Sequence, residues 1–147
     1  MRPMSPDIVR DAMVPEPTTL VADASAQEAG RCFADSGEVR AIFVTEEDGR
    51  LLGVVTRKTL VREVVAAGLE PSAVTVREIA EPPNFTLDAG LELEGAFRFL
   101  EEHDLERVPV VEEGGRLVGV LSRAVVQRRL AEDEPPEGEP AQDPLVL

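Results

Sequence analysis

The nine residues GRLLGVVTR at positions 49–57 recur almost unchanged as GRLVGVLSR at positions 115–123. Each copy runs from a glycine through apolar and β-branched residues to a hydroxyl side chain and an arginine. The two copies keep a fixed offset of 66 positions, which indicates a duplicated unit. The central glycine of each copy, Gly53 or Gly119, allows another backbone to approach a strand closely.

The duplication extends upstream of these runs with one residue of slippage. VRDAM at 9–13 matches VREIA at 76–80, so the repeat covers roughly residues 9–131. The last segment differs, because it holds six carboxylates and four prolines but no basic residue. Such a composition cannot bury enough apolar area to become ordered. The expected organisation is a first unit with an N-terminal lead in residues 1–68, a second unit in 69–131 and a disordered acidic tail in 132–147.

Local patterns in the first unit predict the order β-α-β-β-α. Thr18–Val21 is a short β-prone run, and SAQEAGRCFADS at 25–36 has the capping box and the apolar spacing of an amphipathic helix. Residues 40–56 place two apolar runs on either side of an Asp-Gly pair, which suits a tight hairpin turn. A second helix is expected over 57–68, because a threonine precedes it and a glycine ends it.

The second unit repeats this order with a helix at 91–104, a hairpin over 107–122 and a helix at 123–131. A three-stranded sheet with both helices on one face leaves its other face apolar, because the runs AIFV and VPVV show little alternation. Two such faces can bury each other. The sequence therefore predicts an α/β (α+β) protein whose two β-α-β-β-α repeats pack sheet to sheet with pseudo-two-fold symmetry, with clefts where the halves meet.

Composition argues against several classes of partner. The 29 acidic residues outnumber the 15 basic ones and give a net charge of −14, which repels nucleic acid and anionic membrane surfaces. No apolar run approaches the length of a membrane span and no N-terminal leader is seen, so we expect a cytoplasmic protein. The single cysteine, Cys32, and the single histidine, His103, cannot build a Cys/His zinc site.

The residues that could carry catalysis are sparse. His103 lies near the end of a predicted helix, where a solvated histidine favours the helix dipole. Cys32 beside Phe33 is interpreted as a small core residue rather than a reactive thiol. Neither a GxGxxG fingerprint nor a P-loop occurs. We therefore expect no enzyme, and keep a hydrolase or transferase only as a hypothesis that turnover of a nucleotide would support.

The tandem β-α-β-β-α order, VPVV before a glycine-containing turn, and the strand endings GVVTR and GVLSR resemble the cystathionine-β-synthase (CBS) domain pair, or Bateman module. The resemblance spans both repeats. It implies a regulatory module that binds an adenosyl ligand, such as AMP, ADP, ATP or S-adenosylmethionine, between its halves. It also implies no required cofactor, a homodimer formed through the helix faces, and a regulated enzyme, transporter or channel that the sequence does not name.

The nucleotide signature of that family runs Gly, two hydrophobic residues, Thr or Ser, two variable residues and Asp, with the Asp holding the ribose. This chain has Thr59 and Val125 in the two Asp positions. Threonine can still hydrogen-bond a hydroxyl, whereas valine leaves it unpaired at a cost of roughly 1–3 kcal/mol. The half-site of Thr56 and Thr59 is therefore the expected ligand site, and that of Ser122 and Val125 is expected to be degenerate.

Two interpretations apply to the end of each repeated strand. Thr56 and Ser122 can simply be N-caps, a common role for hydroxyl side chains. Arg57 and Arg123 stand at the first helical position, where a cation opposes the helix dipole. A bound anion would explain that placement, because a helix N-terminus offers free N–H groups and positive potential.

The resemblance also assigns residues before and within the hairpins. Arg107 occupies a place where relatives often contact phosphate; its first-repeat counterpart is Ala41, and neighbouring Arg40 can substitute. Pro109 is matched by Phe43, which can wall an adenine or fill the core. The excess of carboxylates favours AMP or S-adenosylmethionine over ATP.

Two hypotheses of different classes follow. In the first, the pair is an adenosyl sensor whose halves change their angle on binding. In the second, the missing aspartates mark an apo interaction scaffold with degenerate sites, and ligand titration separates the two.

Overall fold

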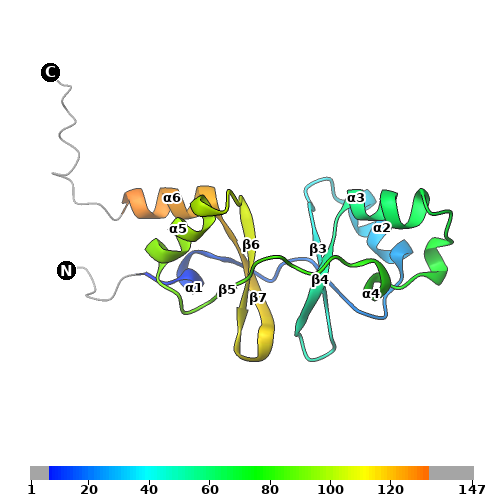
Figure 1. The fold of residues 1–147 in the computed structure, drawn as a ribbon, viewed down its shortest axis with the longest axis horizontal. Coiled ribbons are helices and arrows are strands. Elements are labelled where there is room, and N and C mark those ends of the chain that lie inside the picture. Colours follow the sequence, from blue (N-terminus) through cyan, green and yellow to red (C-terminus); the bar gives the residue numbers. More distant parts are fainter. Residues whose placement is uncertain (1–6, 133–147) are drawn as a thin grey trace, which may run out of the picture.

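Two sheets lie side by side at the centre of the molecule, and helices cover the outer face of each (Figure 1). The structure, a computed structural model, describes residues 7–132. The predicted α+β class and its two repeats are confirmed. The predicted tail lies outside the described residues except for Glu132, which ends the last helix.

The first half contains a three-stranded sheet in the order β2-β3-β4. Strand β3 pairs parallel with β2 and antiparallel with β4. Its elements are β2 (Thr19–Val21), α2 (Ala26–Asp35), β3 (Ile42–Thr45), β4 (Leu51–Val55), α3 (Arg57–Leu60), the π-helical turn η1 (Val61–Val65), the 3-10 turn η2 (Pro71–Ala73) and α4 (Val76–Ile79).

The helix cap and the hairpin turn that the sequence predicts are both present in this half. Ser25 caps α2 through a capping box, since its Oγ accepts from the Glu28 amide at 3.1 Å and Glu28 Oε1 accepts from the Ser25 amide at 3.1 Å. Gly49 takes a φ of 92° in the hairpin turn. The helix predicted over 57–68 is shorter and widens into a π turn before Gly68 reverses the chain with a φ of 73°.

The second half contains a four-stranded sheet in the order β1-β7-β6-β5 rather than the three strands predicted. Strand β6 pairs parallel with β5 and antiparallel with β7. Its elements are α1 (Val9–Ala12), β1 (Val14–Pro15), β5 (Leu87–Asp88), α5 (Leu93–Glu102), β6 (Arg107–Glu112), the 3-10 turn η3 (Glu113–Gly115), β7 (Arg116–Ser122) and α6 (Arg123–Glu132).

The extra strand arises because the segment that opens each repeat, called its lead, packs on the other half. Helix α1 and strand β1 form the lead of the first repeat, yet β1 pairs antiparallel with β7 and Val9 is buried in the core that holds Leu121. Helix α4 lies in the lead of the second repeat, yet Val76 is buried in the core of the first half. A boundary at residue 68 divides the repeats along the sequence, whereas in space the two leads are exchanged.

The exchanged leads explain the repeated glycines. A Cβ atom at Gly53 would lie 2.7 Å from the Glu81 carbonyl oxygen, in the lead that follows α4. A Cβ atom at Gly119 would lie 2.6 Å from Met13 Sδ and 2.8 Å from the Val14 carbonyl oxygen, in the lead that forms β1. In both halves the crossing chain therefore runs directly over the strand, where only glycine leaves room.

Each half has its own apolar core between sheet and helices. In β3, Ile42 and Val44 face the helices and are fully buried. Phe43 between them faces the other half and pairs across the hairpin with Val54. Pro109 and Val120 form the equivalent pair in the second half. These two pairs give the sheets apolar faces that look toward each other.

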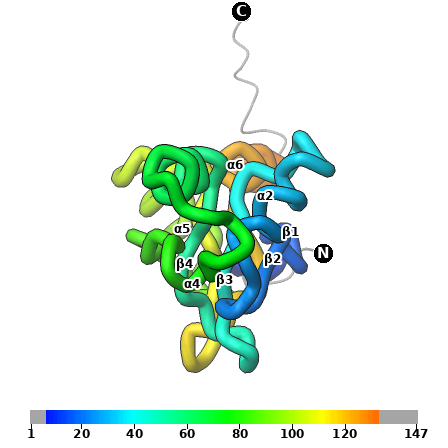
Figure 2. Tube along the Cα trace, turned by 90° about the vertical axis from the view of Figure 1, so that its right-hand side faces the viewer, coloured from blue at the N-terminus to red at the C-terminus, as the bar shows by residue number. Residues whose placement is uncertain are grey.

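The two hairpin turns lie at the same end of the molecule in both views (Figure 1, Figure 2). They are joined there by a bridge between Arg50 and Arg116, in which the Leu117 amide donates to the Gly49 carbonyl at 3.0 Å. This contact links the halves at one end and leaves the space between the sheets accessible elsewhere.

Candidate functional site

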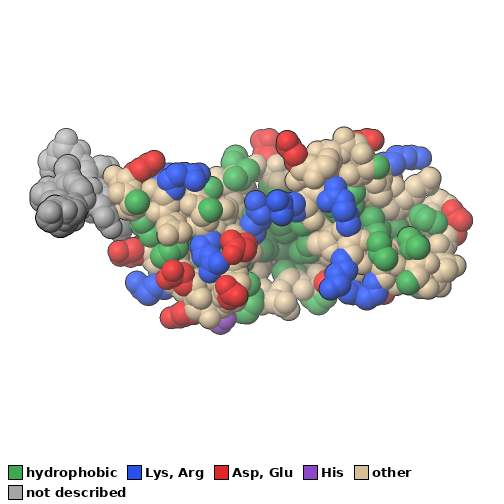
Figure 3. All heavy atoms as spheres, turned by 90° about the horizontal axis from the view of Figure 1, so that it is seen from above, with side chains coloured by type: hydrophobic (Ala, Val, Ile, Leu, Met, Phe, Trp, Pro, Cys, Tyr) green, Lys and Arg blue, Asp and Glu red, His purple; other side chains and the backbone are tan. Residues whose placement is uncertain are grey.

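A cleft of about 620 Å³ lies between the two halves and is lined by residues of both. Its volume falls in the range of roughly 300–1,000 Å³ that is typical of small-molecule sites. Figure 3 shows hydrophobic side chains between the halves with Lys or Arg side chains beside them. The lining residues are Val14, Pro17, Thr18, Ser36, Glu38, Val39, Arg40, Ala41, Phe43, Val54, Arg107, Val108, Pro109, Val120, Ser122 and Val125.

The structure therefore brings together five residues that the sequence singled out as a ligand site. They come from both repeats: Arg40, Phe43, Arg107, Pro109 and Ser122. Arg40 lies just before β3, whereas Arg107 begins β6, so the two guanidinium groups approach from opposite halves. The expectation that clefts form where the halves meet is met by this geometry.

The charges of Arg40 and Arg107 are not neutralised by carboxylates of residues 7–132, and both side chains are exposed. Most other arginines in this part of the chain are paired with a carboxylate: Arg10, Arg50, Arg62, Arg77, Arg116, Arg123 and Arg129. In a chain of net charge −14, the cleft is thus lined by two arginines without carboxylate partners in residues 7–132 and by one acidic residue, Glu38.

The apolar part of the cleft comes from the paired strand residues. Phe43 is 8% exposed and lies across β3 and β4 from Val54, while Pro109 lies across β6 and β7 from Val120. The Phe43 ring is largely buried, as expected of a core residue, and it also lines the cleft; its contact with an adenine stays a prediction. The site thus offers an aromatic ring and aliphatic surfaces next to two guanidinium groups.

Thr56 and Thr59 do not line this cleft, and their side chains are bonded to each other. The Thr59 side chain is 1% exposed, and its Oγ1 accepts from the Thr56 amide at 3.0 Å. The Thr59 amide donates to Thr56 Oγ1 at 3.2 Å, and the two hydroxyl oxygens lie 3.0 Å apart. The capping role predicted for Thr56 is confirmed, and the same bonds occupy the Thr59 hydroxyl expected to meet a ribose.

The Ser122 end of the repeat is the more open one. Ser122 Oγ accepts a long bond of 3.4 Å from the Val125 amide, and both side chains line the large cleft. The order of the half-sites thus differs from the sequence expectation, since the wider space lies at the half-site expected to be degenerate. Ligand binding at either one stays a prediction.

The Arg57 guanidinium binds carbonyl groups at the C-terminal end of another helix, α2. Its guanidinium donates to the carbonyl oxygens of Val39 at 2.7 Å, Phe33 at 3.1 Å and Ser36 at 3.3 Å. It also lies 4.8 Å from the centre of the Phe33 ring. These carbonyls lie in the last turn of α2 and just after it, where a cation is favourable. The structure thus gives Arg57 a capping role at the end of α2, and anion binding by Arg57 stays a prediction.

The Arg123 side chain is likewise paired with neighbouring residues. Its guanidinium lies 2.6 Å from the Glu106 carboxylate and 3.6 Å from that of Asp104. Its amide donates to the Glu106 carbonyl at 2.9 Å. The Arg123 side chain therefore ties α6 to the loop after α5 and has its charge neutralised there.

Substitution of Arg57 tests its capping role at α2. The Arg57→Ala variant should lose roughly 1–2 kcal/mol of unfolding free energy, because three carbonyl groups lose a charged donor. Its affinity for a cleft ligand should be unchanged. Urea unfolding and ligand titration measure the two effects. Lys58→Ala, which removes an exposed cation at the next position, is the matched control and should change neither; equal stability of both variants would contradict the capping role.

A smaller cleft of about 220 Å³ lies on the other side of the same wall. It shares Val54, Arg107, Val108 and Pro109 with the large cleft. The remaining lining residues are Glu81, Pro82, Pro83, Asn84, Phe85 and Leu105. The two clefts are related by the repeat, because each is bounded by the lead of one repeat and by the start of a hairpin.

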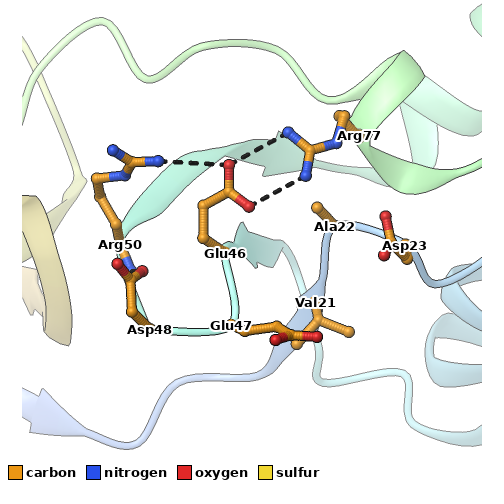
Figure 4. Close-up of a pocket in the computed structure, with 8 residues that line it drawn as sticks. All are labelled: Val21, Ala22, Asp23, Glu46, Glu47, Asp48, Arg50 and Arg77. Carbon is orange, nitrogen blue, oxygen red and sulfur yellow. Dashed lines mark hydrogen bonds and ion pairs between the residues drawn. The ribbon is translucent and has the colours of Figure 1, made fainter.

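A further cavity of about 490 Å³ lies at the end of the β3–β4 hairpin and is rich in charged groups (Figure 4). Arg77 donates to both carboxylate oxygens of Glu46, at 3.0 and 3.2 Å, and Arg50 donates to one of them at 3.4 Å. The hydrogen bonds from Arg77 hold the pKa of Glu46 below its ordinary value, with the nearby charge of Arg50 adding to the effect. This network attaches α4 to the first hairpin.

The Glu46 network predicts a pH dependence of stability. Because folding lowers the pKa of Glu46, its contribution is complete above the ordinary pKa of 4.5 and is lost as the pH falls through the lowered value. The difference in unfolding free energy between the native protein and Glu46→Gln should therefore be larger at about pH 7 than at about pH 3. Urea titrations of both proteins measure it. Glu47→Gln is the control. If the difference in unfolding free energy between the native protein and Glu46→Gln is the same at both pH values, the stabilising role of ionised Glu46 is contradicted.

His103 packs against two phenylalanine rings. The His103 ring lies 4.7 Å from Phe85 and 4.5 Å from Phe99, measured between ring centres. No group of three or more His, Cys, Asp and Glu side chains in this range is arranged to hold a metal ion. Across the same residues, every helix is too short or too polar to cross a membrane.

Comparisons with known proteins agree with this architecture. The sequence model of the CBS domain matches residues 9–66 and 76–132. Hypoxic response protein 1 of Mycobacterium tuberculosis (strain CDC 1551 / Oshkosh) is 32% identical over 114 residues, which are 78% of this chain and 79% of that protein.

Two solved structures extend the comparison. A crystal structure of hypoxic response protein I with two coordinated zinc ions is similar at a TM-score of 0.71 and 29% identity, covering 84% of this chain and 98% of that one. The cytosolic domain of the Mg²⁺ channel MgtE in complex with ATP is similar at a TM-score of 0.67 and 26% identity, covering 84% of this chain and 48% of that one.

Proposed function

The chain belongs to the CBS domain family, and on that basis we propose that it is a non-catalytic regulatory module that binds an adenosine monophosphate in the large cleft. One observation carries the proposal: Arg40 and Arg107, from opposite halves, stand without carboxylate partners in residues 7–132 beside an apolar cleft of about 620 Å³. An anion with a flat apolar body matches that combination of groups.

Each part of AMP has a counterpart in the cleft. The purine packs against Phe43 and Pro109, because an aromatic ring and a proline offer flat apolar surfaces. The phosphate lies between Arg40 and Arg107, whose planar guanidinium groups suit bidentate bonds to its oxygens. Ligand contacts with both halves would fix the angle between them, which is how binding reaches a partner protein.

The charge of the chain selects among adenosyl ligands. The structural relative that carries ATP supports an adenine nucleotide. A net charge of −14 opposes a triphosphate more than a monophosphate. S-adenosylmethionine, a cation, lacks the phosphate that two guanidinium groups would hold. The expected order of affinity is therefore AMP, then ADP, then ATP, with S-adenosylmethionine weakest.

Isothermal titration with these four ligands tests the proposal. Saturable heat with AMP, and weaker heat with ATP, is the expected result. An absence of heat with all four would favour the alternative function, an interaction scaffold whose clefts are filled by side chains. Chromatography of the AMP after long incubation should recover it unchanged, because no catalytic role is proposed.

We further propose that the chain forms a homodimer through the helices of its first half. Val61 and Val65 are 57% and 69% exposed, and a groove of about 390 Å³ beside them is lined mostly by apolar residues of α2, α3 and η1. An apolar helix face of this kind is a common contact between copies of a chain.

The Val65→Glu variant should convert the dimer to a monomer, because it places a charge in the contact. Light scattering after size-exclusion chromatography measures the mass. Val21→Glu changes a similarly exposed valine, 48% exposed, on β2 and should leave the dimer intact. A monomeric native protein would contradict the proposal.

A further inference from the structure

Arg107 lies on the wall between the two clefts and lines both of them. Among residues 7–132 it is the one basic side chain that lines the smaller cleft, whereas the larger cleft also has Arg40. The repeat-related position in the first half is Ala41, which lines only the larger cleft. The duplicated fold therefore provides two clefts but a single guanidinium on their shared wall.

Among its lining residues the smaller cleft has no other cation to pair with a phosphate, and Asn84 supplies only a neutral amide donor. Its remaining charged residue is Glu81, whose carboxylate is paired with Arg62. The larger cleft keeps one cation, Arg40, even when Arg107 turns away. For charge pairing, an anion thus depends on Arg107 alone in the smaller cleft and on both Arg107 and Arg40 in the larger.

We propose that this sharing makes the clefts mutually exclusive for nucleotides, so that each chain binds one AMP and not two. The inference rests on the proposed function. A guanidinium that forms bidentate bonds to a phosphate in one cleft cannot make them to a phosphate in the other. Two phosphates on either side of one wall would also repel each other without a second cation between them. The larger cleft, with two arginines, is occupied first.

Titration calorimetry of AMP with the native protein and with Ala41→Arg tests the coupling. Native protein should bind one AMP per chain. Ala41→Arg adds a third guanidinium to the larger cleft, beside Arg40 and Arg107. Arg40 and the new arginine can then hold a phosphate there without Arg107, so the stoichiometry should rise to two. Ala41→Gln, a long side chain without charge, is the matched control and should bind one or fewer.

A second measurement does not depend on the variant's folding. Phosphorus NMR of AMP added in excess to native protein should show one bound resonance, because only one cleft is filled. Two bound resonances and two independent sites on native protein would overturn the coupling but leave the proposed function intact. No bound AMP by either method would overturn both.

Discussion

The Gly119→Val variant is expected to lose about 3 kcal/mol or more of its free energy of unfolding. Even the Cβ atom would lie 2.6 Å from Met13 Sδ and 2.8 Å from the Val14 carbonyl oxygen. The chain can relieve this overlap only by moving the N-terminal lead off β7. That movement would break the β1–β7 pairing and expose Val9 and Ala12, which are buried in the second core.

Gly53→Ala should also destabilise the protein. Alanine is smaller than valine, but its Cβ atom would meet backbone, which cannot move aside as a flexible side chain can. Its Cβ atom would meet the Glu81 carbonyl oxygen at 2.7 Å and the Ala80 Cβ at 2.9 Å. Urea unfolding compares both variants with Gly37→Ala, whose added Cβ meets nothing within 4 Å. The control should remain within about 1 kcal/mol of the native protein. Gly119→Val as stable as the control would refute the account of the crossing leads.

The second large effect is expected on ligand binding. The Arg40→Gln/Arg107→Gln double variant should bind AMP at least roughly 100-fold more weakly than the native protein. Each lost charged hydrogen bond to phosphate is worth about 1.5–3 kcal/mol, and the variant removes both guanidinium groups. Glutamine keeps much of the side-chain length, so packing at the cleft rim changes little.

A matched control separates local contacts from the general loss of positive charge. Arg98→Gln/Arg128→Gln removes the same charge from exposed positions on α5 and α6, away from the cleft. This control should change AMP affinity by less than about 3-fold, because exposed distant charges are screened by salt. Equal losses in the two double variants would show that Arg40 and Arg107 do not contact the ligand.

The repeat and its local patterns were sufficient to predict the halves. The capping box of Ser25 and the Asp-Gly turn depend on neighbours in sequence, so their signals are local and both were confirmed. The exchange of the leads could not be predicted in the same way. Strand β1 has only two residues, and its pairing with β7 depends on a contact between distant segments.

The candidate site also contains residues whose place could be predicted from the sequence and residues whose partners are too distant in sequence to predict. Arg40 and Arg107 were placed from their positions near the hairpins, and the structure brings both to the large cleft. Arg57 was interpreted from its own helix, whereas the carbonyls that it binds belong to residues 33–39. Thr59 was expected to face a ligand, but its hydroxyl closes the capping box. Sequence spacing does not show which of two nearby partners a hydroxyl will choose.

The most direct test of the central claim is equilibrium dialysis of the native protein against AMP. The chain has no Trp and no Tyr, so adenine absorbance in the near ultraviolet can be read with little protein background. We expect an excess of adenine on the protein side that saturates at one AMP per chain. Equal adenine on both sides of the membrane at every concentration would contradict the assignment of the cleft as an adenosine monophosphate site.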